Sequence, residues 1–512
     1  MEYQLGKEAY QVCETVFEGT AEQPVDLDLT LPDYCPDIEK ILKCRIIPRV
    51  TGKNISGDRL DVDGSALISL YYLDSGKKAV RVCEHTVPYS AGFTIKGGCD
   101  DPAAVVRLKT DYLNCRAVSP RRADIHGAFS VSVCVYGKDQ QEYCCDIEGD
   151  DIQQKKHTEK LSRLSGIAQQ QFSITEVLDI GQGKGMPESI IRDELYLKTE
   201  SCKALDDKLM ITGEAVLRIL YVTDIDSGSL DTMTFHVPFT QVLDVTGIKA
   251  DTENKIILEV MNYDTMLKSE YDENSTLVTL DAKICAVVLA FEQTETTLVD
   301  DAYSTKYELD LDQKAARLTG FVPMEDEVFS VKEELNTGDN VITQIVDLWC
   351  DGVNNINSYE DSVLNIKGKL NCCILALDGD GVPFYIERPV EFSHSVPMEQ
   401  EQREMNVRMS VSPEGLSFRI TGDNTIEVRA DMRLSGTLFT SKTIRAVTGA
   451  ESSEDRIRTK DKTAALTVYY ADKGESLWNI ARMYCTSPEA LRLENDMNED
   501  IVASRQMILI PM

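Results

Sequence analysis

The chain has 512 residues, which is enough for three or four domains of ordinary size. Its 53 basic and 86 acidic residues give a net charge of −33, which argues against nucleic acid and anionic membrane surfaces as partners, because both would repel the chain. Hydrophobic residues make up 42%, which is typical of a globular protein, so we expect buried cores and assign most of the charge to solubility.

The sequence shows no obvious targeting segment. Its longest apolar stretch, Ile284–Phe291, is far shorter than the ~20 residues that a membrane span needs. The N-terminal residues lack the charged-then-apolar pattern of an export signal. The 15 cysteines are an odd number, and Cys134, Cys285 and Cys372 fall within apolar strand patterns. Together these features predict buried, reduced cysteines in a cytoplasmic protein.

The body of the chain contains three copies of one strand pattern, in which apolar residues alternate around a central glycine. The glycines are Gly64, Gly213 and Gly368, so the repeat is about one domain long. A glycine within a strand usually marks a bulge or a close backbone approach. The alternating positions run over Leu60–Tyr72, Leu209–Tyr221 and Leu364–Ala376.

A second landmark follows each glycine-centred strand at a similar distance. Its three versions are Val87-Pro88-Tyr89, Val237-Pro238-Phe239 and the weaker Val390-Glu391-Phe392. Further alternating strands close each copy, so the body is predicted to be mainly β. We expect short helical pieces only at Pro36–Leu42 and Pro187–Ile191.

Polar stretches separate the three copies and set the predicted domain boundaries. We place the first repeat at residues 1–155, the second at 165–312 and the third at 317–448. Residues 449–463 are short, charged and free of apolar periodicity, so they are predicted to form a linker. Residues 464–512 form a separate C-terminal module.

The C-terminal module is predicted to contain a strand, two helices and a closing strand in that order. The first strand is Leu466–Tyr470, and a polar turn follows it. Leu477–Tyr484 have the i, i+3, i+4, i+7 apolar spacing of a helix. Ser487 and Pro488 fit the N-cap and the first position of a second helix. The closing strand is Gln506–Met512.

This module resembles a LysM domain in Lys473–Ala481, in Tyr484 and Asn495, and in the closing strand. LysM domains usually bind N-acetylglucosamine polymers such as peptidoglycan or chitin, in a groove between the first strand–helix loop and the second helix–strand loop. Core packing is an equally good assignment for Trp478, because so small a domain needs every large apolar group. The resemblance gives these binding residues: Gly474, Glu475, Ser476, Leu477, Trp478, Asn495, Asp496, Met497 and Ile501.

Leu31–Leu42, read together with the triplicated glycine strands, resembles SPOCS repeats. Such repeats followed by one LysM domain resemble the SipL-type spore-coat morphogenetic proteins of clostridia and their relatives. The resemblance implies a cytoplasmic protein on the mother-cell side of the forespore in a sporulating bacterium. It also implies that the LysM domain engages a self-assembling coat ATPase rather than a glycan.

No motif for catalysis, metal binding or cofactor binding is apparent. No Cys or His lies at ligand spacing around the five histidines, and adjacent pairs such as Cys144-Cys145 are not C-x-x-C motifs. Gly181–Gly185 lacks the order of a phosphate-binding loop, and Asp378–Gly381 lacks the rest of a calcium loop, so we expect turns at both. We therefore expect no cofactor, no metal and no enzyme activity.

The sequence thus predicts three β-rich SPOCS-type repeats followed by a small α+β LysM domain. The favoured function is a non-enzymatic adaptor in spore-coat assembly, with Leu477, Trp478, Met497 and Ile501 as candidate anchors for a partner protein. The alternative is a protein that binds peptidoglycan of the spore cortex or cell wall. The missing export signal and the atypical Glu494 and Arg505 count against that alternative. A third possibility, a hydrolase with a LysM anchor, lacks any recognisable set of catalytic residues. We expect neither nucleic acid as a partner nor insertion into a membrane.

Overall fold

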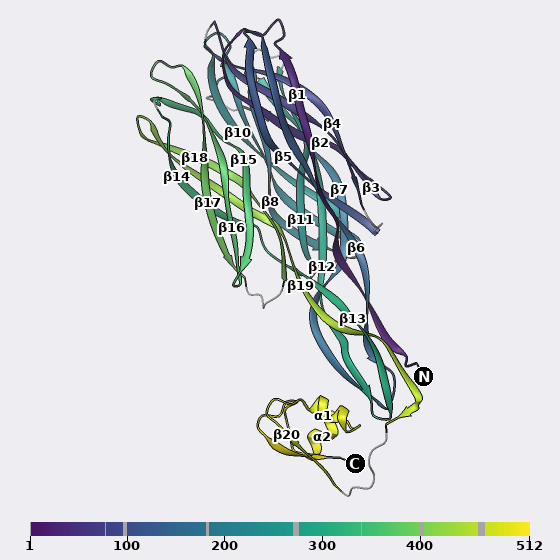
Figure 1. The fold of residues 1–512 in the computed structure, drawn as a ribbon. Coiled ribbons are helices and arrows are strands. Elements are labelled where there is room, and N and C mark those ends of the chain that lie inside the picture. Colours follow the sequence, from purple (N-terminus) through teal and green to yellow (C-terminus); the bar gives the residue numbers. More distant parts are fainter. Residues whose placement is uncertain are drawn as a thin grey trace.

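The computed structural model describes residues 2–76, 78–95, 100–180, 184–269, 276–338, 340–398, 404–458 and 466–511. The protein is mainly β, as predicted, with 79% of its residues in strands and 3% in helices. Long antiparallel strands form an elongated body, and the two helices lie in a small module at one end (Figure 1). Within these described ranges, no helix has the length and apolar character that crossing a membrane requires.

The three repeats share one order of strands: a long strand, a three-stranded meander, and two closing strands, of which the last pairs both with the first strand and with the strand before it. The first repeat contains β1 (Leu5–Thr30), β2 (Ile38–Ser56), β3 (Arg59–Asp74), β4 (Val80–Thr94), β5 (Asp100–Ser119) and β6 (Arg122–Ile147). The second repeat contains β7 (Ile152–Asp179), β8 (Ser189–Leu205), β9 (Lys208–Asp224), β10 (Ser229–Asp244), β11 (Glu253–Ser269) and β12 (Thr276–Ser304).

In the third repeat two strands replace the single long first strand. The break falls at Pro323, which has no backbone N–H to donate to a ladder. The strands are β13 (Tyr307–Val322), β14 (Glu327–Asn336), β15 (Gln344–Glu360), β16 (Val363–Leu377), β17 (Pro383–Pro397), β18 (Glu404–Gly422) and β19 (Thr425–Ile457). Both β13 and β14 pair with β19, so the third repeat keeps the topology of the other two.

Each repeat packs its meander against its closing sheet. The meanders are β2-β3-β4, β8-β9-β10 and β15-β16-β17, and the closing sheets are centred on β6, β12 and β19. Alternating side chains of the two sheets meet in a shared core, as in a β-sandwich. In the first repeat Leu60 and Ile68 of β3 join Phe129 and Val131 of β6.

The three central glycines and the second landmarks face each other across the meanders. The pairs are Gly64 with Tyr89, Gly213 with Phe239, and Gly368 with Phe392. A Cβ at Gly64 would lie 2.2 Å from the carbonyl oxygen of Arg49 and 2.4 Å from the Tyr89 ring. The carbonyl oxygens of Lys198 and Asn354 come equally close at the other two glycines, at 2.2 and 2.3 Å. The predicted close backbone approach is therefore confirmed in all three copies.

Two local predictions from the sequence were wrong. Pro36–Leu42 and Pro187–Ile191 contain no helix, because β2 begins at Ile38 and β8 begins at Ser189. Their backbones pair with the middle strands of the meanders, and this long-range pairing overrides the local preference. By contrast, Asp378–Gly381 form the predicted turn, in which the Gly381 amide donates to the Asp378 carbonyl at 3.1 Å.

The predicted linker also needs correction. Residues 449–457 continue β19 and pair with β13, because β13 offers them a free edge as ladder partner. Residues 459–463, the rest of the predicted linker, lie outside the described residues, as do residues 181–183 of the predicted glycine-rich turn.

Every cysteine that the structure describes carries a free thiol; Cys285 and Cys372 are buried, and Cys134 is half-buried.

The three meanders meet in one apolar cluster at the centre of the body. Tyr71, Leu220 and Leu375 contribute to it from the middle strands, and each lies seven positions after its central glycine. The equivalent positions show that the repeats are arranged around a common centre. The closing sheets also touch, since Phe291 of β12 stacks on Phe321 of β13 at a centroid distance of 4.2 Å.

Buried and half-buried ion pairs lie near this centre and join the repeats. The carboxylate of Asp347 on β15 is fully buried and accepts from Arg192 Nη2 at 2.8 Å and Arg218 Nη2 at 2.6 Å. These contacts tie the second repeat to the third. Asp351, also on β15, accepts from Arg45 Nε at 3.0 Å and Lys43 Nζ at 3.2 Å, which ties the first repeat to the third. The three repeats therefore form one body.

The Asp351 contacts predict a pH dependence. Burial by itself raises the pKa of Asp351, but Arg45 and Lys43 outweigh it and hold the pKa below its ordinary value. Because the pKa of Asp351 is lower in the folded than in the unfolded protein, its ionised carboxylate stabilises the fold above pH ~4. This stabilisation is lost as the pH falls through the folded-state pKa of Asp351. We expect Asp351→Asn to be less stable than wild type at pH 7, and this gap in urea midpoint to narrow below about pH 4. A gap of constant size between pH 7 and pH 3 would contradict this assignment.

Candidate functional site

The C-terminal module has the predicted order of elements. It consists of β20 (Thr467–Ala471), α1 (Leu477–Met483), α2 (Pro488–Glu494) and β21 (Gln506–Ile510), with β20 antiparallel to β21. The Ser487 hydroxyl accepts from the Ala490 amide at 3.1 Å, so the predicted N-cap of α2 is confirmed. Leu477, Ile480 and Leu491 pack with Ile508 in a small core of the module.

The two loops that were predicted to border a groove lie side by side. Three backbone hydrogen bonds join them: Gly474 N to Val502 O at 2.8 Å, Val502 N to Glu475 O at 2.9 Å, and Leu477 N to Asp500 O at 2.8 Å. Gly474 has a φ of +91°, a conformation that glycine adopts without strain. We call residues 472–477 together with 496–502 the two-loop surface.

The candidate residues differ in how accessible they are on this surface. Ile501 is 56% exposed. Gly474 and Asp496 are also exposed, whereas Glu475, Ser476 and Met497 are half-buried. The accessible part of the two-loop surface therefore combines one exposed aliphatic side chain with backbone and acidic groups.

Two other candidates serve the fold of the module. Leu477 has 0% exposure and belongs to its core, so it offers no surface for a partner in this structure. The Asn495 side chain donates to the Leu491 and Leu509 carbonyls, both at 2.8 Å, and accepts from the Leu509 amide at 2.7 Å. Asn495 thus fastens the end of α2 to β21, because all three of its bonds remain within the module.

Trp478 faces the body of the protein and not the two-loop surface. Its ring meets that of Tyr303 on β12 edge-on, with centroids 4.8 Å apart. Its indole Nε1 donates to Asp301 Oδ2 at 2.8 Å. Arg482 of α1 forms an ion pair with the same carboxylate and lies over the Tyr303 ring at 5.4 Å. The sequence left open whether Trp478 packs or binds; in this structure it packs against the second repeat.

Tyr303 of the body belongs to the apolar core of the module. It is 3% exposed, and its hydroxyl donates to the Thr486 carbonyl oxygen at 2.8 Å. Burial raises the pKa of this hydroxyl, so it remains a neutral donor. Sequence reasoning missed Tyr303 and Asp301, because they lie far from the module along the chain and no local pattern connects them with Trp478.

This contact predicts a stability effect. We expect Tyr303→Ala to lower the stability of the docked module by about 3 kcal/mol, because a buried ring and a hydrogen bond are lost. Fluorescence of Trp478 in a Trp349→Phe background would report the transition, since these are the two tryptophans of the chain. The control is Tyr470→Ala, which removes a ring that is 68% exposed. Equal shifts for both variants would argue against docking through Tyr303.

The described part of the chain shows no group of three or more His, Cys, Asp or Glu side chains placed to hold a metal ion.

Comparison with known families matches two segments of the body. Residues 37–118 and 187–268 fit the model described as SipL, SPOCS domain. The first segment covers β2 to β5 and the second covers β8 to β11, so each contains a meander and the strand after it. No curated protein and no solved structure matches the chain. In these two segments the protein is similar to the SPOCS domain of SipL, and this similarity suggests a protein related to sporulation.

Proposed function

We propose that this protein is a non-enzymatic adaptor in spore-coat assembly. In this proposal the three repeats form a body on the mother-cell side of the forespore, and the C-terminal module is a LysM domain that binds a coat-assembly protein. The two SPOCS matches support the sporulation role. The resemblance of the module to LysM domains supports the recognition role and points to a self-assembling coat ATPase as partner.

The observation that carries the proposal is that the two-loop surface is held in place by hydrogen bonds and remains exposed. Its two loops are held together by three backbone hydrogen bonds, and α1 docks on the body through Trp478, which is not part of this surface. The surface therefore needs little ordering when a partner binds, which lowers the entropic cost of association. Ile501, 56% exposed, is the apolar side chain best placed to anchor a partner.

The test compares point variants of the full chain. A chain that ends at Thr463 would uncover Tyr303 and Asp301, so truncation changes the body as well as removing the module. Ile501→Asp alters only the exposed surface. Met483→Asp is the matched control, because Met483 is 64% exposed and lies at the opposite end of α1 from the two loops.

Tagged wild type and both variants would be incubated with lysate of sporulating cells, and the retained proteins identified. We expect a coat-assembly protein on wild type and Met483→Asp, and a loss of at least tenfold on Ile501→Asp. Equal retention by all three would refute binding through the two-loop surface. Co-sedimentation with insoluble peptidoglycan that Ile501→Asp abolishes would instead favour the glycan-binding alternative.

A further inference from the structure

A cavity with a volume of about 480 Å³ lies between the three repeats. Its walls come from β2 and β5 of the first repeat, β8 and β11 of the second, and β18 and β19 of the third. All of these except β19 are edge strands that pair on one side only. The volume falls within the ~300–1,000 Å³ of typical small-molecule sites.

The charge of the cavity wall is opposite to that of the whole chain. The wall contains the cations Lys53, Arg107, Lys255 and Arg433, against the carboxylates Glu259 and Asp326. A positive excess in a chain of net charge −33 means that the local field favours an anion there.

Three of these four cations already have partners within the protein. Lys53, whose side chain is 2% exposed, lies 2.5 Å from Glu259 Oε2, and the other oxygen of Glu259 accepts from the Val106 amide at 2.5 Å. Burial raises the pKa of Glu259, while Lys53 and, more weakly, Arg107 oppose that shift. Lys255 Nζ lies 2.8 Å from Asp326.

Arg433 is the third cation with a partner. Its guanidinium forms a 2.6 Å ion pair with Glu414, and it lies 3.7 Å from Asp326. Both carboxylates of the cavity wall are therefore already engaged by other cations, which leaves Arg107 as the remaining positive group.

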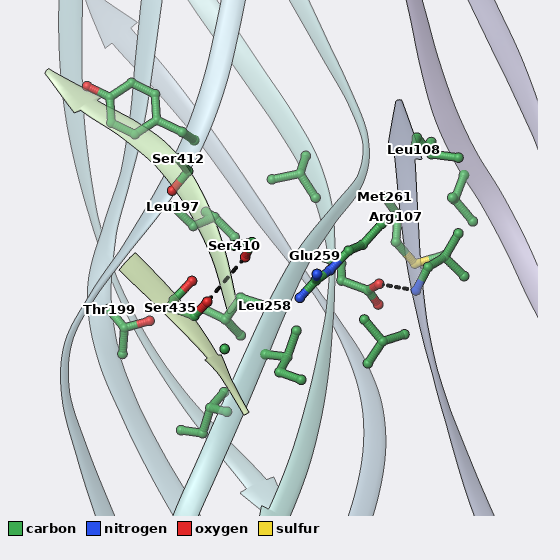
Figure 2. A pocket seen from close by; sticks show the side chains of 18 of the residues that line it. Arg107, Leu108, Leu197, Thr199, Leu258, Glu259, Met261, Ser410, Ser412 and Ser435 are labelled. Atoms are coloured by element: carbon green, nitrogen blue, oxygen red, sulfur yellow. Dashed lines mark hydrogen bonds between the residues drawn. The ribbon is translucent and has the colours of Figure 1, made fainter. Parts of the chain in front are cut away.

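The Arg107 side chain makes no hydrogen bond and no ion pair with any residue that the structure describes, although its charge acts on Glu259 and Cys134. Its side chain extends from β5 into the cavity, towards the side formed by Ser410 and Ser435 (Figure 2). It also lines an adjoining cavity of about 740 Å³, together with Asn354 and Asn355. Arg107 thus stands where two cavities meet, with its donors open to solvent.

We propose that this inter-repeat cavity binds a small organic anion, whose carboxylate or phosphate group pairs with Arg107. A guanidinium presents a planar fork of donors that matches both anions in a bidentate manner. The Ser435 hydroxyl offers a donor near the anion, whereas the Ser410 hydroxyl already donates to the Ser435 carbonyl oxygen at 3.3 Å. Leu108, Leu197 and Leu258 offer apolar contacts for the rest of the molecule. The site is independent of the C-terminal module and of the adaptor function.

The test uses two probes that differ only in their head group, octanoate and octyl phosphate, titrated calorimetrically into the full chain. We expect at least one of them to bind with one site per chain, and binding to weaken by about tenfold or more in Arg107→Gln. Arg107→Glu should weaken it further. The probe that binds more tightly identifies the head group.

Arg116→Gln is the matched control, because Arg116 is also exposed and also lies on β5, but does not line either cavity. It should bind the probes like wild type, and all variants should keep the wild-type unfolding temperature, since both arginines are exposed. The proposal is overturned if wild type binds neither probe, or if Arg107→Gln and Arg116→Gln bind equally well.

Discussion

Replacing Asp347 by alanine should destabilise the protein by about 3–5 kcal/mol, because it removes one partner of a buried ion pair. The Asp347 carboxylate is 0% exposed, and the side chain of Arg192 is 1% exposed. Without the carboxylate, Arg192 would be left with Glu194 at 3.0 Å as its ion-pair partner among the described residues. Arg218 would lose a contact of 2.6 Å at the same time. We expect the substitution to weaken the junction between the second and third repeats, because Asp347 lies in the third repeat and both arginines lie in the second.

The measurement is the midpoint of urea unfolding of the full chain. We compare midpoints and not fitted free energies of unfolding, because several repeats need not unfold in a single step. The control is Asp310→Ala, which removes an exposed ion pair with Arg456 whose side chains are 56% and 70% exposed. Exposed pairs of this kind contribute about 0–1 kcal/mol, so the control should hardly shift the midpoint. Similar shifts for Asp347→Ala and Asp310→Ala would show that the repeats do not depend on this network.

The second large effect is expected at the central glycines. In Gly213→Ala the new methyl carbon would lie 2.2 Å from the Lys198 carbonyl oxygen and 2.9 Å from the Phe239 ring. This carbonyl belongs to the backbone of the neighbouring strand, so the overlap with the methyl carbon can be removed only if that strand shifts. We expect a loss of about 3 kcal/mol, the upper part of the range for overpacked cores. Gly64→Ala and Gly368→Ala should behave alike, because the same two groups crowd each position.

Gly52→Ala is the matched control for this series. Gly52 lies on β2 in the same meander as Gly64, but a Cβ there would have nothing within 4 Å. The substitution should be neutral or slightly stabilising, since alanine restricts the unfolded chain more than glycine does. If thermal unfolding shows equal losses for Gly52→Ala and Gly64→Ala, the crowding at the central glycines does not limit stability.

Much of the body could be predicted from the sequence because strand alternation is a local signal. The period of two identified the strands, and the shared register of Gly64, Gly213 and Gly368 identified the internal repeat. The sequence also showed the second landmarks, although not that Tyr89 and its equivalents cover these glycines. That pairing depends on how two strands align, which the order of residues along each strand does not specify.

The features that the sequence did not predict depend on contacts between distant residues. Asp347 and Arg192 are 155 positions apart, and Trp478 and Asp301 are 177 apart, so no local pattern relates them. The helix predicted at Pro36–Leu42 was wrong for the same reason, since pairing with β3 determines the conformation of this segment. In the module, strand, helices and N-cap were predicted correctly because caps and amphipathic spacing are local. The side that Trp478 faces was not.

Docking of the module has a consequence for recognition. Because Trp478 and Arg482 are engaged with Asp301 and Tyr303, α1 contacts the body while Ile501 stays exposed. A partner that binds the two-loop surface would therefore meet a module whose orientation relative to the repeats is already set. Variants at Tyr303 should weaken partner binding indirectly, by loosening this orientation, whereas variants at Ile501 should act on the contact itself.

The most direct test of the adaptor function is the position of the protein in sporulating cells. Fluorescent fusions of the full-length wild type, Ile501→Asp and the control Met483→Asp would be imaged in a sporulating host that lacks the native protein. We predict that wild type and Met483→Asp surround the forespore, whereas Ile501→Asp spreads through the mother cell. A wild-type protein that does not reach the forespore surface, or an Ile501→Asp variant that surrounds it as wild type does, would contradict the account.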